Sequence, residues 1–170
     1  MGSFQPLSPV VTDILQTTYD ITNTSHGIAA GVVYQFVVEA FNAVGVSTKS
    51  PSVAIRAATL PSPPLNLHSV SSTFNSITFG WSVPTDNGGT PVTDYKVYWN
   101  GGIDNNPFGL LSSTTLGFIT YTYQTGIVAG TYYEFKVVAK NAIGDSAFST
   151  KIRIIAASVP DAPVSLALVS

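Results

Sequence analysis

The stretch that decides the fold reads SITFGWSVPTDNGGTPVTDYKVYW and occupies residues 76–99. Apolar side chains alternate with polar or small ones at both ends of the stretch, which is the period of a β-strand with one buried face. Between them, residues 84–89 are rich in the Pro, Asp, Asn and Gly that form turns. The stretch therefore predicts two antiparallel strands, whose inward side chains are Ile77, Phe79 and Trp81, then Tyr95, Val97 and Trp99.

The same alternation continues along the chain, and no helical period competes with it. Turn residues at 100–107, 126–130 and 141–144 separate the segments. Short alternating strands about ten residues apart predict an antiparallel sandwich of two sheets. The further inward positions are Ile119, Tyr121 and Tyr123, then Tyr133, Phe135, Val137 and Ala139, with shorter strands around Leu65 and Leu67 and around Ile152 and Ile154.

An internal repeat sets the domain boundaries. A shift of 99 residues superimposes residues 31–64 on residues 130–163 without an insertion. A period of this length is that of a small domain, so the chain is predicted to be part of a tandem array. We expect a complete unit at residues 60–159. Residues 1–59 would be the C-terminal half of a preceding unit, with residues 1–3 interpreted as a cloning remnant, and residues 160–170 the linker and first strand of a following one.

Composition excludes several classes of function. The chain has 170 residues, a net charge of −2, only 9% charged residues and no cysteine. Without a cluster of Lys and Arg it cannot neutralise several phosphates, so we expect no nucleic-acid partner. The apolar runs are far shorter than the ~20 residues of a spanning helix, so we expect no membrane insertion. The absence of cysteine excludes disulfides, thiolate zinc sites and a Cys nucleophile.

A search for catalytic or ligand-binding residues predicts none. His26 and His68 lie in different units, and neither has a partner at metal-ligand spacing. No Gly-x-Ser-x-Gly elbow is present. We therefore expect no enzyme, no cofactor and no metal site. Asn23 begins an N-glycosylation acceptor, which has meaning only in a secretory route. The carboxylates are scattered through loops and strand starts: Asp86, Asp94, Asp104, Glu134, Asp145 and Asp161.

The order and spacing of these motifs resemble the fibronectin type III family. Residues 76–99 resemble its B strand, BC loop and C strand, and residues 127–144 resemble its EF turn, tyrosine-bearing F strand and FG turn. The resemblance implies an all-β, immunoglobulin-like antiparallel β-sandwich. Tyr133, repeated by Tyr34, fits a tyrosine corner, whose hydroxyl bonds the backbone a few residues upstream. In the FG turn Ile143 stands where an Arg-Gly-Asp motif would need Arg, so a tight hairpin is expected there and at its copy, residues 42–47.

This resemblance predicts a non-catalytic structural or adhesion module. It would act as a semi-rigid spacer in a modular extracellular or cell-surface protein and would contact protein partners. One alternative is an accessory module of a secreted carbohydrate-active enzyme, favoured if Tyr98, Tyr132 and Phe148 form a coplanar exposed row. Another is an intracellular, cytoplasmic cytoskeletal array of titin-like modules. Because unpaired strand edges recruit other strands, we also expect self-association through the first half-unit and through residues 162–169.

Overall fold

The structure is a computed structural model that describes residues 17–22 and 26–162. The chain divides into two compact units, residues 1–59 and residues 60–170. Asn23 and residues 163–170 lie outside the described residues, so the glycosylation acceptor and most of the expected C-terminal strand receive no structural account.

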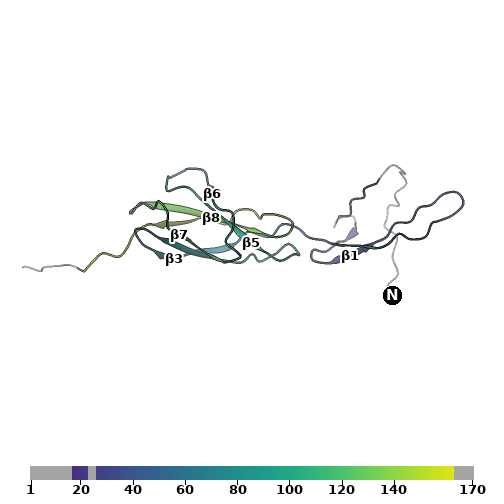
Figure 1. The fold of residues 1–170 in the computed structure, drawn as a ribbon, viewed down its shortest axis with the longest axis horizontal. Coiled ribbons are helices and arrows are strands. Elements are labelled where there is room, and N and C mark those ends of the chain that lie inside the picture. The colour runs from purple at the N-terminus through teal and green to yellow at the C-terminus, as the bar shows by residue number, and fades with distance from the viewer. Residues whose placement is uncertain (1–16, 23–25, 163–170) are drawn as a thin grey trace, which may run out of the picture. The chain divides into compact units, whose positions relative to one another are not determined.

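The second unit is an antiparallel sandwich, which confirms the expected fold class. One sheet has the strand order β3-β4-β7, and the other has the order β6-β5-β8-β9. Figure 1 shows the two sheets as facing layers, with β3 and β7 in one and β6 and β8 in the other. The strands are β3 (Leu65–Ser72), β4 (Ile77–Ser82), β5 (Asp94–Trp99), β6 (Gly109–Ser112), β7 (Thr120–Tyr123), β8 (Tyr132–Lys140) and β9 (Ile152–Ile155).

The core lies between these sheets and is built from the alternating positions. Phe79 of β4 stacks on Phe135 of β8 with a centroid separation of 4.6 Å, so the two layers meet through aromatic rings. Trp81 is 1% exposed and packs edge-on against Tyr95. The indole N–H of Trp81 has no hydrogen-bond partner among the described residues. Trp81 therefore stabilises the fold by filling space rather than by a polar contact.

The predicted tyrosine corner and the predicted turn at residues 84–89 are confirmed. The Tyr133 hydroxyl accepts a hydrogen bond from the backbone N–H of Val128 at 2.9 Å, while the ring is 2% exposed. This is the tyrosine corner. Gly88 and Gly89 have φ values of 72° and 83°, a conformation that residues with a Cβ adopt at a cost.

Two strand expectations differ from the structure. β6 was not predicted, because its Gly-Leu-Leu-Ser sequence has no alternation; Leu111 packs on the core while Leu110 is 54% exposed. The prediction that Ile119 points inward with Tyr121 is wrong. Ile119 lies before β7 and is 45% exposed, and its carbonyl accepts a hydrogen bond from the backbone N–H of Trp81.

The first unit contains β1 (Val33–Phe36) and β2 (Val53–Arg56), which form an antiparallel pair. Its register copies that of β8 and β9 at a shift of 99 residues: Tyr34 faces Ile55 as Tyr133 faces Ile154. The Tyr34 hydroxyl likewise accepts a hydrogen bond from an upstream N–H, that of Ala29, at 2.9 Å. The repeat in the sequence is thus a repeat of local structure.

Both predicted hairpins are tight turns closed by an asparagine. Asn141 accepts hydrogen bonds from the N–H groups of Ile143 and Gly144 through its side-chain oxygen, at 2.9 and 3.1 Å. In the first unit Asn42 does the same with Val44 and Gly45. The side-chain oxygen therefore satisfies two turn donors in each copy.

Candidate interaction surface

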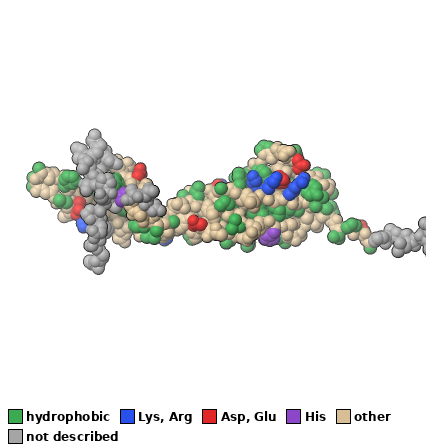
Figure 2. All heavy atoms as spheres, turned by 180° about the vertical axis from the view of Figure 1, so that it is seen from behind, with side chains coloured by type: hydrophobic (Ala, Val, Ile, Leu, Met, Phe, Trp, Pro, Cys, Tyr) green, Lys and Arg blue, Asp and Glu red, His purple; other side chains and the backbone are tan. Residues whose placement is uncertain are grey.

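The two outer faces of the sandwich differ in charge. All five Lys and Arg residues of the second unit lie on or beside the β6-β5-β8-β9 sheet, whereas the outer face of β3-β4-β7 carries hydroxyl groups such as the Thr78–Thr122 pair. The space-filling view shows Lys and Arg side chains gathered in one patch beside acidic ones (Figure 2). We call the outer face of the β6-β5-β8-β9 sheet the basic–aromatic face. Its basic residues are Lys96, Lys136, Lys140, Lys151 and Arg153.

The centre of the basic–aromatic face is a lysine held by aromatic rings. Lys136 alternates with the buried Phe135 and Val137, so its side chain points outward. The ammonium lies 4.3 Å from the ring centroid of Phe108 and 5.3 Å from that of Phe148. These are cation–π distances. The lysine therefore covers part of the two apolar rings.

Ion pairs surround Lys136 and balance much of the positive charge of the basic–aromatic face. Arg153 lies over the ring of Tyr132 at 4.1 Å and pairs with Asp104 at 3.3 Å. Lys151 pairs with Glu134 at 2.8 Å. Lys96 pairs with Asp145 in the hairpin, and this hydrogen bond raises the pKa of Lys96. The Arg153–Asp104 pair is exposed, at 48% and 71%, so it contributes little to stability and mainly orders the surface. The other two pairs are partly covered, since the side chains of Lys96 and Glu134 are 24% and 12% exposed.

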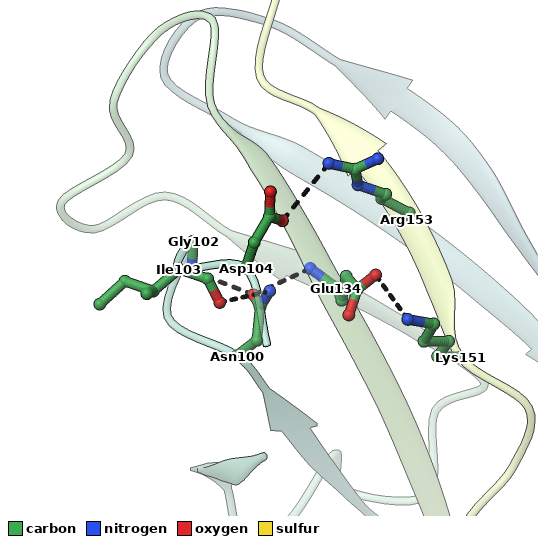
Figure 3. Close-up of polar contacts among 7 residues, drawn as sticks. All are labelled: Asn100, Gly102, Ile103, Asp104, Glu134, Lys151 and Arg153. Atoms are coloured by element: carbon green, nitrogen blue, oxygen red, sulfur yellow. Dashed lines mark hydrogen bonds and ion pairs between the residues drawn. The ribbon is translucent and has the colours of Figure 1, made fainter. Parts of the chain in front are cut away.

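A buried asparagine positions the loop that carries Asp104. Asn100 is 1% exposed and follows β5 directly. Its side-chain oxygen accepts hydrogen bonds from the N–H groups of Gly102 and Glu134, at 3.0 and 3.1 Å. Its side-chain nitrogen donates to the carbonyl of Ile103 at 3.1 Å. Figure 3 shows the resulting network, in which one side chain fixes the loop to β8. The sequence marked this segment as a turn but did not single out Asn100.

A carboxylate, that of Asp94, organises the loops at the start of β5, the end opposite Asn100. Burial alone would raise the pKa of Asp94, but hydrogen bonds to its carboxylate from the Thr114 hydroxyl and from the N–H groups of Thr115, Tyr95 and Gly117 lower that pKa to about 2. A carboxylate that accepts several hydrogen bonds is stabilised in its charged form. Asp94 is thus a loop anchor that stays ionised at neutral pH.

The candidate ligand and catalytic side chains singled out by the sequence do not come together among the described residues. No group of three or more His, Cys, Asp or Glu side chains lies close enough to hold a metal ion within the ranges 17–22 and 26–162. The Nδ1 atom of His68 lies 2.9 Å from the carbonyl oxygen of Asn66, and no carboxylate is bonded to the ring. A cavity of about 420 Å³ near Pro84 and Pro91 has Tyr95 as its only titratable lining residue, and burial raises the pKa of that phenol.

The exposed aromatic side chains do not form one coplanar row. Tyr98 and Phe148 are 4.9 Å apart with an interplanar angle of 85°, so they meet edge to face. Tyr132 is engaged by Arg153 instead. A flat polysaccharide surface stacks on parallel rings, and Tyr98 and Phe148 do not offer this.

No helix among the described residues is long and apolar enough to cross a membrane.

The strand order, the tyrosine corner and the buried Trp81 define a class of domain, the seven-stranded immunoglobulin-like sandwich. A sequence model described as "Fibronectin type III domain" matches residues 62–155. The chain belongs to the fibronectin type III family.

Its relatives are parts of larger proteins of different kinds. The chain is 34% identical to Exoglucanase B of Cellulomonas fimi across 89% of its own length and 14% of that protein. It is 35% identical to Chitinase A1 of Niallia circulans, across 78% of the chain and 19% of that protein. It is 34% identical to human Myomesin-2, across 70% of the chain and 8% of that protein. The chain thus spans less than a fifth of each of these relatives.

Solved structures show the same fold. The crystal structure of domains A168–A170 of titin aligns with a TM-score of 0.63 and 20% identity, covering 90% of this chain and 53% of that one. At this level of identity the likeness concerns the fold alone.

Proposed function

We propose that the chain is a non-catalytic spacer within a larger modular protein, in which tandem sandwich units hold other domains apart. The observation that carries this proposal is the short connection between the two units. Ala57 makes two backbone hydrogen bonds within the first unit. Its N–H donates to the carbonyl of Val32 at 2.9 Å, and its carbonyl accepts from the N–H of Gly31 at 2.7 Å. Ser62 is held to Asp86 of the second unit by its N–H, which donates at 2.8 Å, and by its hydroxyl oxygen, which accepts at 3.1 Å.

Only residues 58–61 separate these two anchor points. A connection of this length spans at most about 17 Å when fully extended. Pro61 is buried, and Pro restricts the backbone, so the segment has few conformations to lose. A nine-residue strand such as β8 extends roughly 30 Å, so each unit adds about that length to an array.

The proposal is tested by measuring the distance between the units in solution. The chain has no cysteine, so spin labels can be placed uniquely by T48C and Q124C, both on exposed positions. Pulsed electron spin resonance on the doubly labelled chain should give a narrow distance distribution. Insertion of Gly-Gly-Ser-Gly-Gly-Ser between Thr59 and Leu60 should broaden it. If the native chain is already as broad as the insertion variant, a semi-rigid spacer is refuted.

A second candidate function is an accessory module of a carbohydrate-active enzyme. The identity of 34–35% to an exoglucanase and a chitinase over most of the chain favours this setting. The perpendicular Tyr98 and Phe148 rings favour spacing rather than sugar binding within it. Sedimentation with cellulose and chitin particles should leave the chain in solution. Binding that is lost in F148A would assign carbohydrate recognition to the basic–aromatic face instead.

We also propose an extracellular or cell-surface location, which the relatives named as an exoglucanase and a chitinase support. The relative named as a myomesin supports a cytoplasmic cytoskeletal array as the alternative. Fractionation of the source cells with an antibody to residues 60–159 separates the two locations.

A further inference from the structure

The second unit contains the tripeptide Asn-Gly-Gly twice, at residues 87–89 and at residues 100–102. A glycine has no Cβ to keep its backbone nitrogen away from the side chain of the preceding asparagine. The two copies have the same local geometry. Their glycines have φ values of 72° and 83° in the first copy and of 70° and 77° in the second. In each copy the asparagine side-chain oxygen accepts a hydrogen bond from the N–H of the second glycine, at 2.9 and 3.0 Å. The copies differ in their surroundings, which makes them a matched pair.

The surroundings of Asn87 favour an attack of the next backbone nitrogen on its side chain. The N–H of Gly88 donates to the carboxylate of Asp86 at 2.8 Å, within the reach of a general base. The N–H of Gly89 lies on the oxygen that gains negative charge during such an attack, as in an oxyanion hole. Asn87 is exposed, and its side-chain nitrogen has no hydrogen-bond partner among the described residues, so this nitrogen can depart into solvent as ammonia.

The backbone of Asp86 is fixed, so its carboxylate is held near Gly88. The N–H of Asp86 donates to the Ser62 hydroxyl at 3.1 Å, and its carbonyl accepts from the N–H of Ser62 at 2.8 Å. The general base is thus positioned by the start of the second unit rather than by the turn alone.

The surroundings of Asn100 oppose the same attack. The residue is 1% exposed, so water has little access to it. Its side-chain nitrogen, which would have to leave, donates to the carbonyl of Ile103 at 3.1 Å, and its side-chain oxygen accepts a second hydrogen bond from Glu134 (Figure 3). In the described part of the chain no carboxylate accepts a hydrogen bond from the N–H of Gly101.

We propose that Asn87 is a self-modification site, at which the Gly88 nitrogen closes a succinimide ring with Asp86 as general base, and that the fold keeps Asn100 from the same reaction. The bond between the Gly88 nitrogen and the Asn87 Cγ forms, and the bond between Cγ and Nδ2 breaks. The proton of the Gly88 nitrogen passes through Asp86 to Nδ2, which leaves as ammonia. Water from the solvent then opens the ring at either carbonyl and leaves aspartate or isoaspartate. This inference is independent of the spacer function.

The modification changes a contact between two loops. The backbone carbonyl of Asn87 accepts a hydrogen bond from the side-chain nitrogen of Asn141 at 2.9 Å, which joins residues 84–89 to the hairpin at 141–144. In isoaspartate this carbonyl becomes part of a free carboxylate, and the main chain before Gly88 gains a carbon atom. The reaction therefore adds negative charge at this end of the sandwich and alters the attachment of residues 84–89 to the hairpin.

The proposal is tested by incubating the full chain at mildly alkaline pH and mapping its peptides by mass spectrometry, with isoaspartate detected by enzymatic methylation. In the folded chain Asn100 should convert more slowly than Asn87 by at least about tenfold, since a buried group reacts only when the structure opens. In guanidinium chloride the two copies should convert at similar rates, because their tripeptides are the same. A folded chain that keeps the amide of Asn87, or that converts both copies equally, would overturn the proposal.

A variant tests the role of Asp86 without removing the hydrogen-bond acceptor. D86N retains a side-chain oxygen for the N–H of Gly88 but cannot take its proton, so it should slow conversion of Asn87 in the folded chain and not in guanidinium chloride. D104N is the matched control, because Asp104 is an exposed carboxylate that pairs with Arg153 instead; it should convert Asn87 at the wild-type rate. Tryptophan fluorescence confirms that both variants keep the second unit folded, since both tryptophans lie there. Equal folded-state rates in D86N and D104N would overturn the proposal.

Discussion

Replacing Asn100 with alanine should destabilise the second unit by about 3 kcal/mol. The side chain makes three hydrogen bonds, to Gly102, Ile103 and Glu134, and the residue is 1% exposed. Each such bond contributes about 1 kcal/mol net, and a shortened side chain leaves its former partners poorly solvated. The loop that carries Asp104 would lose its attachment to β8 at the same time.

The loss is measured by urea unfolding followed by tryptophan fluorescence. Trp81 and Trp99 both lie in the second unit, so the signal reports on that unit without interference from the first. With a dependence of about 1–3 kcal/mol per molar urea, the midpoint of N100A should fall by between about 1 and 3 M.

Two matched variants make this prediction refutable. Asn106 is exposed and its side chain donates a single hydrogen bond, to the carbonyl of Asn100 at 3.1 Å, so N106A should cost about 1 kcal/mol or less. Gln124 is exposed in the turn after β7, so Q124A should change stability by less than about 0.5 kcal/mol. If N100A costs no more than N106A, the network does not hold the loop as argued.

Three further outcomes follow. Y133F removes the acceptor of the Val128 N–H and should lower the free energy of unfolding by about 1 kcal/mol, while Y34F should leave the tryptophan-detected transition unchanged. The indole N–H of Trp81 has no hydrogen-bond partner in the part of the chain that the structure describes, so W81F should cost clearly less than the roughly 3–5 kcal/mol of W81A in the same urea titration; equal costs would contradict a space-filling role. The pKa of Asp94 is lowered to about 2, so its contribution to stability is fully present above about pH 4 and is lost as the pH falls from there through about pH 2. After allowance for solvent screening this contribution amounts to about 1 kcal/mol, and D94N should show a shallower loss of stability between pH 4 and pH 2.

The sandwich could be predicted because its information is local and periodic. In β4 and β8 the inward positions alternate with outward ones, and the structure buries Phe79, Trp81, Phe135 and Val137 as the pattern indicates. The tyrosine corner was accessible for a similar reason, since a glycine, a strand start and Tyr133 stand in fixed order. The edge strand β6 was missed because a short edge strand is half solvated and needs no alternation.

The basic–aromatic face could not be predicted as a unit. Lys136, Phe108 and Phe148 come from three segments, and their proximity depends on the pairing of β5 with β6 and β8 and on the irregularity between Val97 and Tyr98. The sequence marked Tyr98, Tyr132 and Phe148 as outward but carries no information on ring orientation. The burial of Asn100 was equally hidden, because an asparagine in a turn is usually exposed.

Residues 60–159 should form a complete module whose stability does not depend on the first unit. We would compare urea unfolding of a 60–159 fragment with that of the full chain, both followed by the fluorescence of Trp81 and Trp99. We expect the same slope and a free energy of unfolding that agrees within about 0.5 kcal/mol. A fragment that unfolds with a smaller slope, or that is weaker by more than about 2 kcal/mol, would show that the module needs residues 1–59 and would contradict the claim.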